Sequence, residues 1–235
     1  MLERHCRFVG QKTVVDLGSG LTPFPAILRH LGLKVHVVSM FDWLRDGAVE
    51  SYTQELVDSI LGYFDKIGIV VHQFDVTDKK YNFDDNAFDA VTCFHVIEHF
   101  HNTPKSTFSE SYRILKADGV FVSAVPNAVN LRKRLSVISG RTNHYNFDEY
   151  YNSEFYYGHV REPTLSEFKQ YYLRSGFEIR EICGRNFIGL GGYLKSTSAS
   201  KRGFGRVIQG AVVPLLELRP ALCSDLHIAG LKPSA

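Results

Sequence analysis

Four things are scarce or absent in this sequence: cysteine, long apolar runs, an excess of one charge, and a third glycine in its glycine-rich turn. The four cysteines are scattered, so we expect neither a disulfide scaffold nor a zinc ribbon. No apolar run approaches the roughly 20 residues that cross a bilayer, and the first residues lack the apolar core of a signal peptide. These absences predict a cytoplasmic protein without a transmembrane segment.

The charge balance excludes one broad class of partner. Lysine and arginine total 27 against 25 aspartate and glutamate, for a net charge of +2. A chain so close to neutrality has no global attraction for the phosphate backbone, so we expect no nucleic-acid partner. Its 235 residues fit one α/β domain more readily than two small domains. We therefore expect a single domain over residues 1–235.

Short apolar segments alternate with amphipathic helical segments along most of the chain. A helix is expected from near Pro25, a longer one carries Val49, Leu56 and Phe64, and another carries Phe108 and Leu115. Such alternation builds parallel strands with helices on both faces of the sheet. The sequence therefore predicts an α/β fold, a doubly wound, mostly parallel sheet of seven strands over 13–17, 34–40, 67–74, 88–94, 120–125, 177–183 and 225–232.

Residues 126–163 interrupt this rhythm. They contain a basic helix candidate over 130–140 and seven Tyr or Phe between 145 and 157, which is too long for an ordinary connection. We expect this cap segment, residues 126–163, to be a helical and aromatic insertion after the fifth strand. Beyond it, Thr164 and Glu167 predict a helix that starts with a capping box. A polar loop over 189–203 and a helix over 206–218 are expected near the end.

The first strand is followed by the turn in "VVDLGSGLTPFP", residues 14–25. Ligands of doubly wound sheets lie outside the carboxyl ends of strands, and Gly18 and Gly20 fall on the first such turn. A dinucleotide fingerprint requires a further glycine where Pro23 stands. The turn therefore favours a different nucleoside ligand, while a tight turn without any ligand remains an alternative.

Five motifs in order, "VVDLGSG", "VHVVSMFD", "HQFDVTD", "NAFDAVTCFHVIEHF" and "SYRILKADGVFVSAVPN", carry a family resemblance. Over residues 13–127 the sequence resembles the class I S-adenosylmethionine-dependent methyltransferases. With "GHVREPTLSEFKQYYLRSGFEI" it looks most like the branch of ubiquinone-biosynthesis O-methyltransferases and cell-surface polysaccharide methyltransferases. The resemblance implies a Rossmann-like fold, S-adenosylmethionine as cofactor, and methylation of an oxygen on a small-molecule or glycan-type acceptor.

The resemblance also assigns cofactor contacts. At the usual ribose-binding position this chain has Ser39 in place of an acid, with Asp42 three residues later, and either residue is a candidate. Asp75 and Val76 are expected at the adenine, although Asp75 also suits a plain turn. The methionine part is expected against Asp16, Gly18, Ser19, Gly20 and, by position, His95.

The segment "HVIEH" supplies candidates for catalysis. We expect His95, His99 and, from "GHVRE", His159 to be catalytic, since a positioned histidine can take the proton of a hydroxyl acceptor. Glu98 is expected to bind the acceptor. The H-x-x-E-H spacing also matches a zinc-peptidase motif. That motif belongs inside a long helix, whereas this one follows a strand, so we expect no metal ion, and a polar helix cap is the other alternative.

The cap segment completes the predicted acceptor site. Tyr157 and Arg161 are candidates for acceptor binding, as part of an aromatic lid over a polar ring. The basic run Arg132, Lys133 and Arg134 could contact a phosphate group, or form a solvated helix face. A second copy of the chain, in a homodimer, is an alternative cover for the cofactor. A non-catalytic binding protein on the same fold is the alternative to an enzyme, favoured by the missing acid at Ser39.

Overall fold

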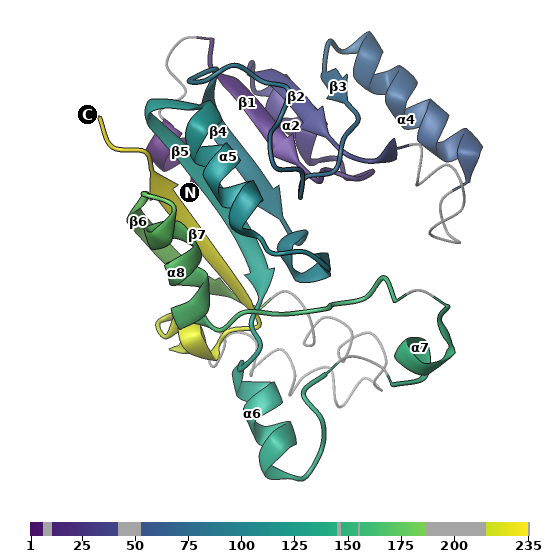
Figure 1. The fold of residues 1–235 in the computed structure, drawn as a ribbon, viewed down its shortest axis with the longest axis vertical. Helices are drawn as coiled ribbons and strands as arrows, with labels where there is room; N and C mark the ends of the chain where they lie inside the picture. Colours follow the sequence, from purple (N-terminus) through teal and green to yellow (C-terminus); the bar gives the residue numbers. More distant parts are fainter. Residues whose placement is uncertain (7–10, 42–52, 145–146, 155, 187–214, 235) are drawn as a thin grey trace, which may run out of the picture.

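The computed structural model describes residues 1–6, 11–41, 53–144, 147–154, 156–186 and 215–234 (Figure 1). At its centre is a seven-stranded sheet in the order β3-β2-β1-β4-β5-β7-β6. All pairings are parallel except those of β7, which runs antiparallel to both β5 and β6. The predicted sheet is thereby confirmed, with strands β1 Thr13–Leu17, β2 Lys34–Val38, β3 Val70–His72, β4 Phe88–Phe94, β5 Leu115–Pro126, β6 Glu178–Arg185 and β7 Asp225–Leu231.

Helices connect the strands and cover both faces of the sheet (Figure 1). The capping box of α8 is confirmed: Thr164 Oγ1 accepts from the Glu167 backbone N–H at 3.2 Å, and the Glu167 carboxylate accepts from the Thr164 N–H at 2.8 Å. The helices are α1 Leu2–Cys6, α2 Phe24–His30, α4 Gln54–Lys66, α5 Lys105–Ile114, α6 Leu131–Ile138, α7 Phe147–Asn152 and α8 Leu165–Arg174, with 3-10 turns η1 Ile97–His99 and η2 Pro220–Leu222.

The central strands β1, β4 and β5 are buried on both sides, because successive side chains point to opposite faces and both faces are covered. In β5, Phe121 packs in the core beneath α5 and α8, whereas Val120 and Val122 pack in the core on the other face. In β1, Val15 packs in the same core as Phe121, and Val14 packs in the core on the other face. The sheet is thus a rigid platform whose carboxyl edge carries the loops.

Some predicted boundaries were wrong. Leu115, expected on a helix, is the first residue of β5, and the pairing of β5 with β4 shifts register between Phe88 and Ala90. Asp118 in the expected turn has a positive φ of 60° and donates its backbone N–H to Lys232 O, so the turn is absorbed into the strand. Strands β2 and β3 are shorter than expected, at Lys34–Val38 and Val70–His72. The loop over 189–203, residues 206–214 of the last expected helix, and Val49 lie outside the described residues.

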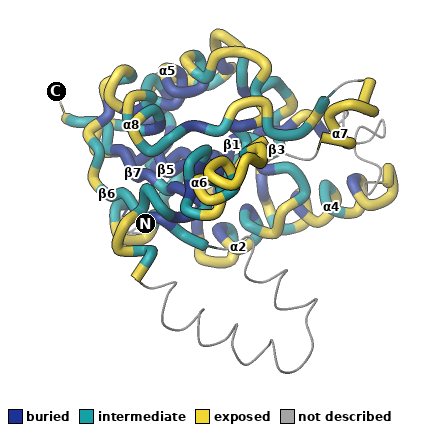
Figure 2. Tube along the Cα trace, turned by 90° about the horizontal axis from the view of Figure 1, so that it is seen from below, coloured by how far each residue is buried: buried dark blue, intermediate teal, exposed yellow. Residues whose placement is uncertain are grey.

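The cap segment lies beyond the carboxyl end of β5, and its helices α6 and α7 contain no buried residue (Figures 1 and 2). Asn130 begins α6 as an N-cap, since its side chain accepts from the Lys133 N–H at 3.0 Å. Among the described residues, no helix has both the length and the apolar character needed to cross a membrane.

Candidate functional site

The order of the strands reverses between β1 and β4, so the connections after these two strands leave in opposite directions. This is the position where open α/β sheets bind ligands. Gly18, directly after β1, has a φ of +69°, and a Cβ added there would lie 2.6 Å from Cγ2 of Val96. Gly20 has a φ of +52° with open space around it. Gly18 therefore lets the chain after β4 approach the turn after β1, and Gly20 supplies the left-handed backbone conformation that this turn requires.

A cavity of about 300 Å³ opens at this switch point. We call it the cofactor cavity. It brings together six of the residues predicted to bind the cofactor: Gly18, Gly20, Ser39, Asp75, Val76 and His95. Sequence reasoning missed its apolar wall, Met40, Phe74, Val96 and Phe100, although each follows a strand end closely enough to be a candidate. His99 also lines this cavity.

Two predicted cofactor residues, Asp16 and Ser19, are absent from the lining of the cavity. Asp16 is 3% exposed, and its carboxylate accepts a hydrogen bond of 2.5 Å from Thr92 Oγ1. Burial raises the pKa of Asp16 to about 7, although the Thr92 hydrogen bond opposes the shift. Ser19 is also buried, and its N–H and that of Gly18 donate to Val38 O, so both amides tie the turn to β2. Asp42 lies outside the described residues.

His95 occupies a strained position at the end of β4. Its φ is 55°, a left-handed conformation that is uncommon for residues other than glycine and that clusters at functional sites. Its Nδ1 lies 3.4 Å from Glu98 Oε1, and its Nε2 lies 3.9 Å from Asp225 Oδ1. The contact with Glu98 raises the pKa of His95, against the opposing effect of burial. The strain places this imidazole between the cofactor cavity and two carboxylates.

His99 and His159 form a histidine pair, with ring centroids 5.0 Å apart and planes at 83°. His99 Nδ1 lies 2.9 Å from Tyr157 O and 3.2 Å from Gly158 O, and because carbonyls only accept, this nitrogen donates. His159 Nδ1 donates to Glu162 Oε1 at 2.7 Å. The backbone N–H groups of residues 160 and 161 both donate to Glu98 O. These bonds fasten the cap segment to η1.

Besides a small cavity of about 120 Å³ whose lining includes His159 and Arg161, two larger cavities lie on the cap side of the histidine pair. One, of about 560 Å³, is the aromatic cavity, lined by His101, Thr142, His144, Phe147, Tyr150, Tyr156, His159 and Val160. The other, of about 320 Å³, is polar, and its lining includes Arg132, Lys133, Glu162 and Asp225. Since His99 lines the cofactor cavity and His159 lines both cap-side cavities, the histidine pair is the wall between them.

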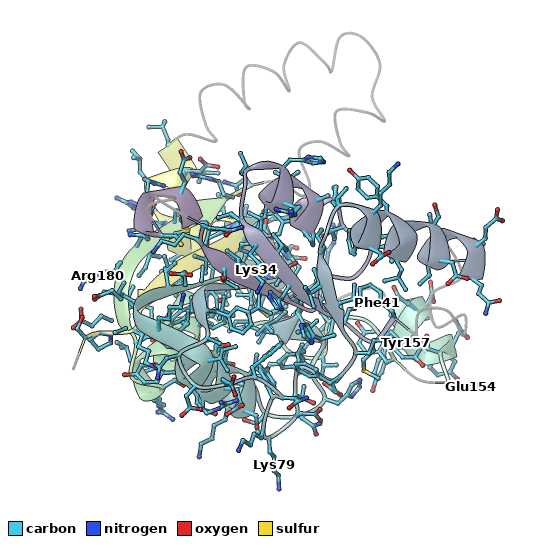
Figure 3. The ribbon with its side chains drawn as sticks, turned by 90° about the horizontal axis from the view of Figure 1, so that it is seen from above. Lys34, Phe41, Lys79, Glu154, Tyr157 and Arg180 are labelled. Carbon is cyan, nitrogen blue, oxygen red and sulfur yellow. The ribbon has the colours of Figure 1, made fainter. Side chains whose placement is uncertain are left out.

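The other predicted acceptor residues, Tyr157 and Arg161, lie outside the linings of the two larger cap-side cavities. Tyr157 is 46% exposed and absent from the lining of the aromatic cavity, which its neighbour Tyr156 enters. In the view of Figure 3, Tyr157 lies on the same side of the molecule as Phe41 and Glu154, opposite Arg180. The Arg161 side chain is 70% exposed and pairs with Glu167 at 2.7 Å.

The basic run of α6 is divided between two roles. Lys133 pairs with Glu162, and both side chains are mostly buried. Arg134 donates to Val129 O at 2.6 Å and to Ala221 O at 3.4 Å. Arg132 lines the polar cavity beside Lys133. Only part of the run therefore faces a space where an anionic group fits.

A seven-stranded sheet with a glycine turn and a cavity at its switch point defines the class: an α/β protein that binds a ligand at the carboxyl edge of its sheet. A family model described as a methyltransferase domain matches residues 6–182. The chain belongs to this family, the class I S-adenosylmethionine-dependent methyltransferases, and its cofactor is S-adenosylmethionine. No curated protein matches the chain by sequence.

Solved structures share the fold at low identity. A chain of the Haloferax volcanii complex that contains the Trm112 methyltransferase activator matches with a TM-score of 0.60 and 18% identity, covering 100% of this chain and 92% of that one. Protein BH2331 of Bacillus halodurans C-125 gives 0.59 and 20%, with 99% and 97% covered. Haemonchus contortus phosphoethanolamine N-methyltransferase 2, in complex with S-adenosyl-L-methionine, gives 0.55 and 18%, with 99% and 51% covered.

Proposed function

We propose that this protein transfers a methyl group from S-adenosylmethionine to an oxygen of a small-molecule or glycan-type acceptor. The observation that carries the proposal is the histidine pair, which forms a wall shared by the cofactor cavity and the cavities under the cap segment. The cofactor on one side and the acceptor on the other would meet at this wall. The aromatic cavity supplies ring faces for a sugar or quinoid ring, and the polar cavity supplies Arg132 and Lys133 for an anionic substituent.

We assign the cofactor contacts as follows. Asp16 accepts the ammonium group of the methionine part, the turn at Gly18 and Gly20 holds the methionine chain, and Asp75 with Val76 meets the adenine. Ser39 lies in the cofactor cavity and is our assignment for the ribose. A serine in place of a carboxylate gives a weaker, uncharged contact.

The chemistry needs positioning more than acid–base assistance. The sulfonium is already activated, so holding the acceptor oxygen in line with the S–CH₃ bond can supply roughly 7 to 11 kcal/mol of the barrier. A hydroxyl acceptor must also lose its proton. In neutral His99, donation by Nδ1 to two carbonyls leaves Nε2 with a lone pair, so this nitrogen can accept a hydrogen bond from the hydroxyl. His95 lies beside it as a second base.

Radiolabelled cofactor provides the test. We expect label transfer to one of a panel of hydroxylated aromatic and glycan acceptors, and a loss of about 10²-fold or more for His99→Asn. The matched control is His30→Asn, a histidine on α2 whose ring contacts Tyr63, and it should retain full activity. Cofactor binding without transfer to any acceptor would instead support the non-catalytic alternative.

A further inference from the structure

Glu98 is a buried acid whose carboxylate lacks the usual hydrogen-bond partners. Its side chain is fully buried, and among the described residues neither oxygen has a hydrogen-bond partner. His95 Nδ1 lies 3.4 Å from Oε1, a contact without hydrogen-bond geometry. Burying a carboxylate in this way is costly, and proteins retain such groups where they are paired with a charge or bind a metal ion.

The histidine pair lies next to this carboxylate. One ligand atom from each of Glu98, His99 and His159 lies within 4.8 Å of the other two. In tetrahedral geometry, two atoms that bind the same zinc ion at about 2.1 Å are about 3.4 Å apart, so a pair at the 4.8 Å limit would have to close by about 1.4 Å.

The hydrogen bonds around the histidine pair are those of metal ligands. A metal-bound imidazole normally donates its other N–H to a carbonyl or carboxylate, which fixes the tautomer and the ring orientation. His99 Nδ1 donates to two backbone carbonyls, and His159 Nδ1 donates to Glu162. Glu162 is in turn held by Lys133. In the neutral form of each ring, the lone pair that could bind a metal ion is therefore on Nε2.

We propose that Glu98, His99 and His159 bind one divalent first-row transition-metal ion, such as zinc or cobalt. Two imidazoles and one carboxylate suit these ions, whereas magnesium and calcium prefer oxygen ligands alone. The ion would lie at the wall between the cofactor cavity and the aromatic cavity. Three protein ligands leave a coordination position for a water molecule or an acceptor oxygen.

This site differs from the zinc-peptidase arrangement that the sequence spacing suggested. There the two histidines of H-x-x-E-H lie on one long helix, whereas here Ile97–His99 is a single 3-10 turn and His95 is not among the three clustered residues. The second histidine comes from the cap segment, and no spacing along the chain reveals that approach. For this reason we revise the expectation that no metal ion binds here.

The role of the ion in the reaction rests on the proposed function. A metal-bound hydroxyl is more acidic, so its proton would pass to solvent. The oxygen would then bond to the methyl carbon while the S–CH₃ electron pair stays on sulfur. His99 would hold the ion in this case, and would not itself take the proton.

Cobalt(II) titration of the purified full chain tests the site, followed by its visible absorption bands. We expect one ion per chain at micromolar concentration, displaced by zinc. Glu98→Gln, His99→Asn and His159→Asn should each weaken binding at least tenfold, and His30→Asn should leave it unchanged. The proposal is overturned if no ion binds up to millimolar cobalt, or if the three ligand variants bind as the parent does.

Two further measurements keep the result interpretable. Glu162→Leu retains all three ligands but removes the acceptor of the His159 N–H, so binding should weaken by about tenfold even if a ligand variant fails to fold. Calorimetric titration with S-adenosylmethionine is made without metal. Cofactor binding with no metal binding would contradict the metal site alone. Metal binding without methyl transfer would support the metal site and contradict the proposed function.

Discussion

The rim of the sheet and the cap segment face each other across the histidine pair, but different interactions hold them in place. At the rim, Asp16 and Gly18 belong to a β1 turn that packs on buried strands on both sides. In the cap segment, α6 and α7 contain no fully buried residue. Polar contacts with η1 attach the segment to the rim, and the ion pairs of Glu162 with Lys133 and His159 join its own two ends. The comparison indicates a rigid rim beside a cap segment that depends on a few hydrogen bonds and ion pairs, so the proposed cofactor site is preformed and the proposed acceptor site is the more easily displaced part.

The largest effect is expected at the rim, from Asp16→Asn. Truncating one partner of a buried charge pair costs about 2 to 5 kcal/mol, so affinity for S-adenosylmethionine should fall at least about 30-fold. The free protein should melt no lower than the parent, because burial already disfavours the charge on this side chain. Calorimetry and thermal melting measure the two quantities. An unchanged cofactor affinity would remove Asp16 from the site.

Next in size is a pair of glycine substitutions that compares the two regions directly. Gly18→Ala introduces a Cβ about 2.6 Å from Val96 at a φ of +69°, and should lower the free energy of unfolding by about 2 to 3 kcal/mol. Gly140→Ala, after α6, has a φ of +75° and open space, and should cost about 1 kcal/mol. Urea denaturation measures both. Equal losses would show that the contact with Val96 contributes nothing.

A smaller effect is expected from pH. The pKa of Asp16 is about 7 in the cofactor-free protein, and an ammonium group beside it must lower that pKa, so binding below pH 7 releases a proton. The dissociation constant of the cofactor should therefore rise as the pH falls below about 7, by up to about tenfold per unit. Above pH 7 this contribution should level off. Titrations in two buffers of different ionisation enthalpy count the proton, and Asp16→Asn should release none.

The two regions also differ in how far the sequence predicts them. The strands β1 and β4 were predicted over their observed bounds because apolar runs buried on both faces leave an unambiguous pattern. The position of the cofactor cavity could be predicted from these strands, since the strand ends of a parallel sheet meet at one edge. By contrast, residues 153–154 and 156–163 form neither helix nor strand, so no period tells which of Tyr156 and Tyr157 enters the aromatic cavity.

The approach of His159 to Glu98 and His99 was hidden for the same physical reason. It depends on hydrogen bonds from the cap backbone to Glu98 O and from His99 to the carbonyls of residues 157 and 158. Such contacts between distant segments are set by tertiary geometry, and they leave no mark on local composition.

The smallest effect, and the one specific to the cap segment, is expected from Lys133→Met. The change keeps the apolar stem but removes the ammonium group that pairs with Glu162, so the cap should open more often while the sheet core stays unchanged. We expect cleavage by a protease within residues 126–163 to accelerate several-fold, with a shift in melting temperature below about 2 °C. Lys105→Met, an exposed lysine at the start of α5, is the matched control and should alter neither quantity. If Lys133→Met instead lowers the melting temperature as much as Gly18→Ala, the cap and the sheet unfold as one unit, and the contrast between them is wrong.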